Sequence, residues 1–154
     1  RRMKAEGIHT ILDTAGDVGW CHFEEVLDFI DLVLFDIKFA SRELHRQFTG
    51  CDNDLILANA QLLSQKGIPM QVRLVMIPGI NDSEAEIRAR MEIISSLKSV
   101  EQIDILPYHR YGAGKYGTLG LEYPLMELGE HTPAQVGLIQ ELVESYGIKT
   151  TIGG

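Results

Sequence analysis

Apolar runs of strand length alternate along the chain with segments of helical periodicity. In residues 23–30, for example, Phe23, Val26, Leu27 and Ile30 recur at helical spacing. Such alternation predicts βαβ units and a parallel sheet. The predicted strands are residues 8–14, 31–38, 70–77 and 102–106, and the predicted helices are residues 23–30, a short one starting at Ser41, then 53–66, 83–97 and 132–146.

The local signals agree with these boundaries. Ser83 with Glu86 has the spacing of a capping box, and Thr132-Pro133 has a capping residue before a proline at the first helical position. We predict a long loop at residues 109–131. A short apolar run, residues 148–152, follows the last predicted helix.

Four βα units are too few to close a barrel, for which about 250 residues are typical. The sequence therefore predicts an α/β fold in a single domain, residues 1–154, that forms part of a (β/α) barrel. The first strand would be an unpaired edge. We expect strands that precede Arg1 in a longer protein, or another chain, to cover it.

Composition narrows the class of protein. The 22 acidic and 14 basic residues give a net charge of −8, and no basic cluster occurs, which argues against nucleic acid as a main partner. No apolar run approaches the roughly 18 residues of a membrane-spanning helix. Cys21 and Cys51 lack the paired spacing of a metal site and suit a reducing cytoplasm.

Polar side chains stand at or near the ends of the predicted strands. Asp13, Asp36, Lys38 and His109 lie at or just past strand ends, and Arg73 interrupts an apolar strand. Because ligands bind at the carboxyl ends of parallel strands, these residues are candidates for a binding site.

Each candidate also has a simpler interpretation. Asp36 and Lys38 share one face of a strand and would bind a ligand or form an internal salt bridge. Arg73 suits a carboxylate, or lies at an edge of the sheet. Asp13 caps a turn or, beside Asp36, forms a pair of hard oxygen donors for a small cation or a ligand amino group. His109 binds a ligand or is simply exposed.

Residues 112–117 match the dinucleotide pattern G-x-G-x-x-G. We reject this interpretation because the glycines do not open a predicted helix after a strand. A mobile loop over the strand ends, acting as a lid or a partner contact, is the better prediction.

At these residues the chain resembles the glycyl-radical-enzyme activating proteins of the radical SAM superfamily, the group that includes pyruvate formate-lyase activating enzyme. The resemblance runs essentially from end to end. Its segments are residues 7–14, 31–38, 72–79 and 105–109, together with Thr49-Gly50.

The resemblance implies a (β/α)6 radical SAM barrel of which this chain supplies the C-terminal four βα units. It also implies S-adenosylmethionine (SAM) and a [4Fe-4S] cluster, which together produce a 5′-deoxyadenosyl radical that takes a hydrogen atom from a glycine of a partner such as pyruvate formate-lyase. Flavodoxin or ferredoxin would donate the electron. By position, the SAM-binding residues are Asp36, Lys38, Arg73 and His109, and Asp13, Thr14 and Asp36 form a monovalent-cation site.

The sequence departs from that family in one respect. It contains neither the C-x-x-x-C-x-x-C motif that holds the cluster nor the Gly-Gly-Glu segment that binds the SAM amino group. Cys21 and Cys51 do not replace three closely spaced thiolates. We therefore expect the C-terminal part of such an enzyme, inactive by itself.

Two other functions remain open at this stage. One is a barrel aldolase or decarboxylase that uses Lys38 as a Schiff-base nucleophile with Asp36 as its acid/base partner. The other is a non-catalytic scaffold or interaction module.

Overall fold

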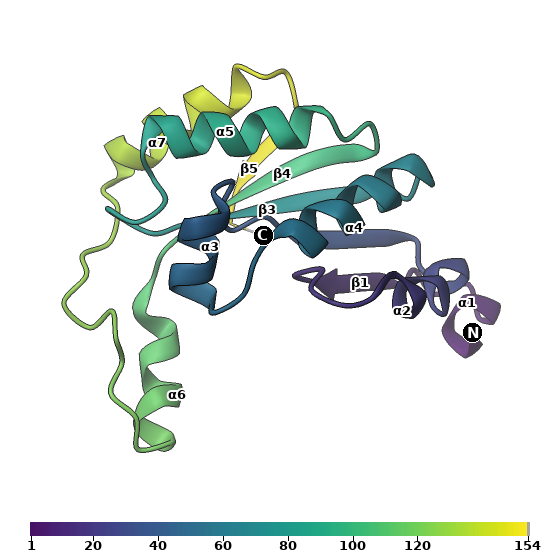
Figure 1. The fold of residues 1–154 in the computed structure, drawn as a ribbon, viewed down its shortest axis with the longest axis horizontal. Coiled ribbons are helices and arrows are strands. Elements are labelled where there is room, and N and C mark those ends of the chain that lie inside the picture. The colour runs from purple at the N-terminus through teal and green to yellow at the C-terminus, as the bar shows by residue number, and fades with distance from the viewer. Residues whose placement is uncertain (154) are drawn as a thin grey trace.

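The predicted parallel α/β sheet is confirmed in a computed structural model that describes residues 1–153. Five parallel strands lie side by side in the order β1-β2-β3-β4-β5 (Figure 1). The strands are β1 Ile11–Thr14, β2 Leu32–Asp36, β3 Met70–Met76, β4 Val100–Pro107 and β5 Thr150–Ile152. The helices are α1 Arg2–Ala5, α2 Trp20–Glu24, α3 Arg42–Thr49, α4 Asp54–Gln65, α5 Glu84–Ser95, α6 Ala113–Thr118 and α7 Pro133–Glu144, with 3-10 turns at Leu27–Phe29 and Arg110–Gly112.

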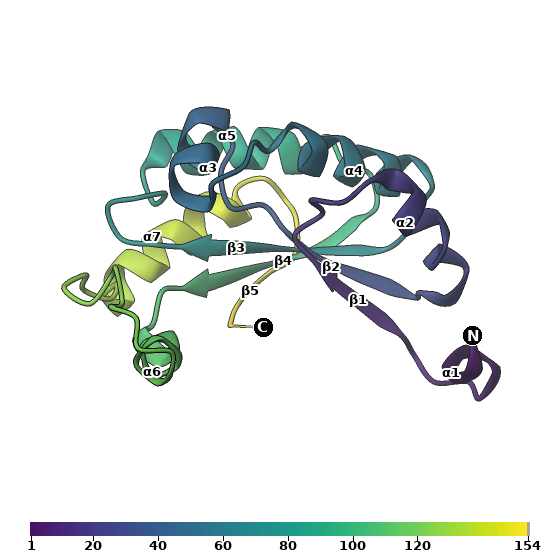
Figure 2. The same cartoon turned by 60° about the horizontal axis from the view of Figure 1, so that its bottom comes forward.

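One face of the sheet is covered by helices, and this is where the core lies. Figure 2 shows α2, α3, α4 and α5 on the same side of the strands, and Ile139 and Val143 of α7 join the same core. Sequential strand order with the helices on one face is the arrangement of a (β/α) barrel, whereas a doubly wound sheet carries helices on both faces. The sheet is thus an arc of a barrel, with β1 and β5 at its edges.

Strict alternation of buried and half-buried residues along β2 and β3 separates this core from the other face. In β2 the residues Val33 and Phe35 are fully buried, whereas Leu34 and Asp36 are half-buried. In β3 the same pattern leaves Gln71 and Arg73 on the face that the helices do not cover.

Three expectations differ from the structure. The run at 148–152 contains a fifth strand, because Thr150 to Ile152 pair with β4. The predicted helix at 23–30 breaks into α2 and a 3-10 turn, since Val26 and Ile30 donate to carbonyls three residues back. The predicted loop at 109–131 contains the short helix α6, which extends away from the helix-covered face (Figures 1 and 2).

Of the two capping predictions, the one at Thr132 is confirmed in full and the one at Ser83 in part. Thr132 forms a full capping box with Gln135 and is followed by Pro133. The Ser83 hydroxyl accepts from the backbone N–H of Glu86, but the Glu86 carboxylate accepts from the Ala40 N–H instead of closing the box. Glu86 thereby ties α5 to the segment after β2.

Within residues 1–153, no helix combines the length and apolarity that crossing a bilayer requires.

Candidate binding site at the strand ends

Four of the predicted site residues meet at the carboxyl ends of β1, β2 and β3. We call Asp13, Asp36, Lys38 and Arg73 the strand-end cluster. Arg73 Nε donates to Asp36 Oδ1 at 2.7 Å, and Lys38 Nζ lies 2.8 Å from Asp36 Oδ2. Arg73 also grips Asp13 with both terminal nitrogens, Nη1 donating to Asp13 Oδ2 at 2.8 Å and Nη2 to Oδ1. The guanidinium thus bridges two carboxylates on neighbouring strands.

The cluster is partly removed from solvent. The side chains of Asp36 and Arg73 are 15% and 19% exposed, whereas that of Asp13 is 60% exposed. Burial works against the charge of Arg73, but its hydrogen bonds to Asp13 and Asp36 outweigh this effect and raise the pKa of the guanidinium above its ordinary value. Arg73 therefore remains a cation in any physiological buffer.

The two other predicted site residues form no hydrogen bond or ion pair with the cluster among residues 1–153. His109 is exposed and lies against Tyr111, with ring centroids 4.2 Å apart, and its Nδ1 accepts from the Tyr111 N–H at 3.3 Å. Thr14 alternates to the face opposite Asp13, and its hydroxyl accepts from the Gly16 N–H at 3.0 Å. No group of three or more His, Cys, Asp or Glu side chains in the described part of the chain is arranged to hold a metal ion.

Three buried asparagines, none of them predicted as a site residue, hold the loops that carry the cluster. Asn59 donates to the carbonyls of Gly16 and Val18 after β1. Asn53 donates to two carbonyls after β2. Asn53 precedes α4 in the manner of a cap residue and Asn59 lies within α4, so nothing in the sequence indicates these long-range bonds and only the fold reveals them.

Asn81 connects the ends of two strands. Its amide donates to the carbonyls of Lys38 and Val75 at 3.0 and 2.8 Å, and its side-chain oxygen accepts from the Ile77 N–H. Arg90 is fully buried on α5 and donates to the Asn81 carbonyl at 2.5 Å. Desolvation lowers the pKa of Arg90 to about 10. Asn81, itself held by Arg90 of α5, thus fixes the backbone at Lys38.

A cavity of about 530 Å³ opens next to the cluster, and Lys38 belongs to both. Its size lies in the range of small-molecule sites, which are mostly apolar with a few polar groups. The lining fits that description and includes Phe39, Phe48, Val75, Tyr116 and Tyr123.

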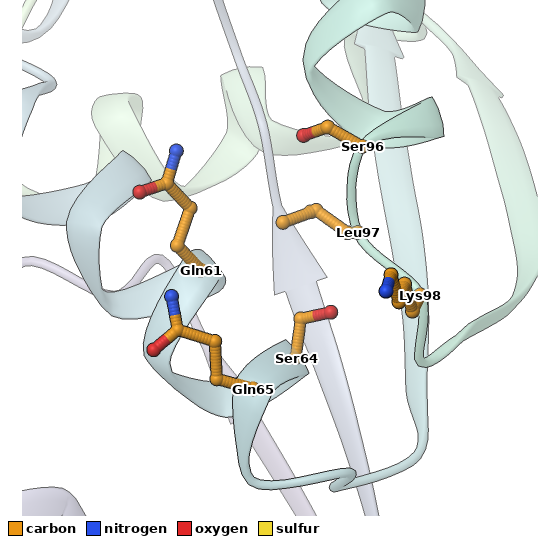
Figure 3. Close-up of a pocket in the computed structure, with 6 residues that line it drawn as sticks. All are labelled: Gln61, Ser64, Gln65, Ser96, Leu97 and Lys98. Atoms are coloured by element: carbon orange, nitrogen blue, oxygen red, sulfur yellow. The ribbon is translucent and has the colours of Figure 1, made fainter.

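A second hollow, of about 600 Å³, lies at the other end of the sheet. Figure 3 shows Gln61, Ser64 and Gln65 of α4 facing Ser96, Leu97 and Lys98, which lead into β4. Because α4 and α5 run into the amino ends of β3 and β4, this hollow is remote from the strand-end cluster. Lys98 is its single charged residue, so it is a poor candidate for chemistry.

Comparison with known proteins finds activating enzymes among the curated relatives, although no protein-family model matches the chain. The trans-4-hydroxy-L-proline dehydratase activating enzyme of Clostridioides difficile is 35% identical over 153 residues, which are 98% of this chain and 50% of that protein. The pyruvate formate-lyase-activating enzyme of Staphylococcus epidermidis is 40% identical over 131 residues, 81% of this chain and 52% of that protein. The chain spans about half the length of these curated relatives.

Solved structures give the same result. A domain of pyruvate-formate lyase-activating enzyme from Bacteroides vulgatus superposes with a TM-score of 0.82 at 27% identity, covering 99% of this chain and 86% of that domain. A radical SAM methyltransferase from Sphaerobacter thermophilus superposes with a TM-score of 0.66 over 96% of this chain and 42% of its own. At 14% identity, the latter likeness concerns the fold alone.

Proposed function

We propose that this chain, which is homologous to the glycyl-radical-enzyme activating enzymes over about half of their length, is the C-terminal, SAM-binding part of such an activase. The observation that carries the proposal is the strand-end cluster. A guanidinium and an ammonium group stand at the carboxyl ends of parallel strands, where barrel enzymes bind ligands. The homology to the activating enzymes then indicates that this ligand is SAM.

The residues present fit SAM. Lys38 and Arg73 are the groups that bind a carboxylate, and SAM carries one on its methionine part. The cavity beside Lys38 has apolar and aromatic walls suited to an adenine ring. His109 follows β4 at the same end of the sheet, and we assign it to the same ligand.

We extend the proposal to a monovalent cation at Asp13, Thr14 and Asp36, in which Thr14 would contribute its backbone carbonyl because its hydroxyl lies on the opposite face. The support is that the carboxylates of Asp13 and Asp36, on neighbouring strands, face the same guanidinium and supply hard oxygen donors. Binding there would require Arg73 to release at least one of them.

The residues present do not fit the [4Fe-4S] cluster. Cys21 and Cys51 are the two cysteines of the sequence, both are free thiols, and we place the cluster ligands outside this chain. In a complete activase, SAM and the reduced cluster would supply the one-electron chemistry that takes a hydrogen atom from a glycine of the partner enzyme.

The remaining assignments follow from the same homology. The partner would be a glycyl-radical enzyme such as pyruvate formate-lyase or a hydroxyproline dehydratase, and flavodoxin or ferredoxin would donate the electron. The free thiols suit the cytoplasm. We expect the chain alone to activate no partner and to bind no stoichiometric iron and sulfide after anaerobic reconstitution.

The direct test is equilibrium binding of SAM to the chain by isothermal titration calorimetry. The proposal predicts saturable binding with one site per chain, and competition by S-adenosylhomocysteine but not by ATP. The matched variants are Lys38→Met, which should weaken binding, and Lys98→Met in the remote hollow, which should not. Absence of saturable binding, or equal loss in both variants, would overturn the proposal.

A further inference from the structure

A row of polar residues crosses the uncovered face of the sheet at the level of Arg73. The strand register pairs Asp36 of β2 with Arg73 of β3, Arg73 with Asp104 of β4, and Asp104 with Thr151 of β5. The neighbours of Asp104 in β4 are Ile103 and Ile105, which are fully buried in the helix-covered core. By alternation Asp104 therefore shares the other face with Arg73.

Asp104 is buried but has no cationic partner. The residue is only 3% exposed, and its Oδ1 accepts from Thr151 Oγ1 and from Gln102 Nε2, both at 2.6 Å. Both donors are neutral. Within residues 1–153, Oδ2 accepts no hydrogen bond and the carboxylate forms no ion pair. A largely buried carboxylate that is held only by neutral donors is stabilised when a positive charge approaches it.

Arg73 does not supply that charge, although it is the neighbour of Asp104 in the sheet. The three hydrogen bonds of its guanidinium go to Asp36 and Asp13, none of them goes to Asp104, and two of its five N–H groups are left for a ligand. The strand-end cluster with Asp104 contains three carboxylates but two basic groups, so one negative formal charge is left unbalanced on this face. The carboxylate without a basic partner is Asp104.

We propose that Asp104 binds the positively charged part of the ligand that occupies this face. This inference rests on the proposed function, in which the ligand is SAM, a molecule with an ammonium and a sulfonium group. Lys38 and Arg73 attract the ligand carboxylate, and Asp104 on the next strand attracts a cationic group. Asp104 is thus a ligand-binding residue that supplies charge complementarity.

A purely structural role is the competing explanation, since Asp104 joins β4 to β5 through Thr151. The two roles differ in what they do to ligand preference. A structural role affects all ligands of the site alike, whereas charge complementarity affects only cationic ones. 5′-Methylthioadenosine, which has the adenosine part of SAM but neither positive group, separates them.

The test is the dissociation constant of SAM and of 5′-methylthioadenosine for the wild-type chain and for Asp104→Asn, measured by calorimetry. Asparagine keeps the shape and an acceptor for Thr151 and Gln102. We expect SAM binding to weaken about ten-fold or more, because a charge-assisted contact is lost, while methylthioadenosine binding changes by less than about two-fold. Glu101→Gln removes one charge from an exposed position of the same strand and should alter neither dissociation constant.

A second variant tests whether the loss of SAM binding could come from a change in the fold. Thr151→Val removes the hydroxyl that joins β5 to Asp104 but keeps the carboxylate, so the preference for SAM over methylthioadenosine should persist even if the thermal unfolding midpoint falls. Equal weakening of both ligands in Asp104→Asn, or no weakening of either, would overturn the inference. If the wild-type chain binds SAM and Asp104→Asn behaves like it, only this inference fails; if the wild type does not bind SAM, the proposed function fails.

Discussion

The two faces of β2 and β3 are built from opposite kinds of residue. The helix-covered face presents fully buried apolar side chains, such as Val33, Phe35 and Val72. The other face presents Asp36 and Arg73 on the same strands, one residue away. Alternation thus lets one strand stabilise the fold with one face and offer charge with the other. The comparison implies that mutations on the two faces should affect different measurements.

The largest effect on stability is expected in the helix-covered core. Phe35→Ala should lower the free energy of unfolding by about 3–5 kcal/mol, because a fully buried ring is replaced by a cavity. Leu34→Ala on the other face of the same strand should cost less than half as much, since Leu34 is half-buried. Urea unfolding of both variants measures this, and equal losses would contradict the division into two faces.

The loop after β1 depends on the same ring. Gly16 has a φ of +79°, and a Cβ there would lie 2.4 Å from Phe35 Cζ. Gly16→Ala should therefore cost about 2–4 kcal/mol of unfolding free energy from backbone strain and overpacking. Gly114 in α6 has open space around it, so Gly114→Ala is the control and should be neutral or slightly stabilising. Similar behaviour of the two variants would show that the loop does not pack on Phe35.

On the face that carries Asp36 and Arg73, we expect mutations to reduce SAM affinity more than they reduce stability. Arg73→Lys keeps the charge but loses the fork that contacts Asp13 and Asp36 together. We expect SAM affinity to fall by about ten-fold, or about 1.4 kcal/mol, with a smaller change in unfolding free energy. The control is Arg88→Lys, which alters an exposed pair with Glu84 on α5. A loss of stability without a loss of affinity would make the cluster merely structural.

The smallest effect is expected at an ion pair that belongs to neither face. Hydrogen bonds from Arg42 and Arg46 lower the pKa of Asp52 from 3.8 to about 2. A lowered carboxyl pKa stabilises the fold above about pH 4, and this contribution disappears as the pH falls toward 2. The difference in unfolding free energy between wild type and Asp52→Asn should thus be present at pH 7 and vanish near pH 2. A difference that stays constant with pH would contradict the assignment.

Much of the strand-end cluster was predictable, for a physical reason. The carboxyl ends of parallel strands meet at one edge of the sheet, so Asp13, Asp36 and Arg73 had to lie near each other once their strands were placed. Alternation also put Lys38 on the face of Asp36. The choice of partners was not predictable, because Arg73 could pair with a carboxylate on either side of it.

The position of Asp104 against β5 was not predictable, because residues 148–152 have no clear strand pattern. Asp104 lies between Ile103 and Ile105, the same signal that drew attention to Arg73, but its contact with Thr151 exists only because β5 pairs with β4. Three residues are too few for a periodic signal. The hydrogen bonds of Asn53, Asn59 and Asn81 likewise depend on contacts between distant segments.

The most direct test of the account is a map of the SAM binding surface by backbone amide chemical shifts. The account predicts that titration with SAM shifts the amides at the strand ends, residues 13–16, 36–39, 73–77 and 104–109. The amides of residues 61–65 and 96–98, around the hollow of Figure 3, should stay unchanged. Shifts confined to that hollow or to the exposed sides of the helices, with none at the strand ends, would contradict the claim that the charged face of the sheet is the binding site.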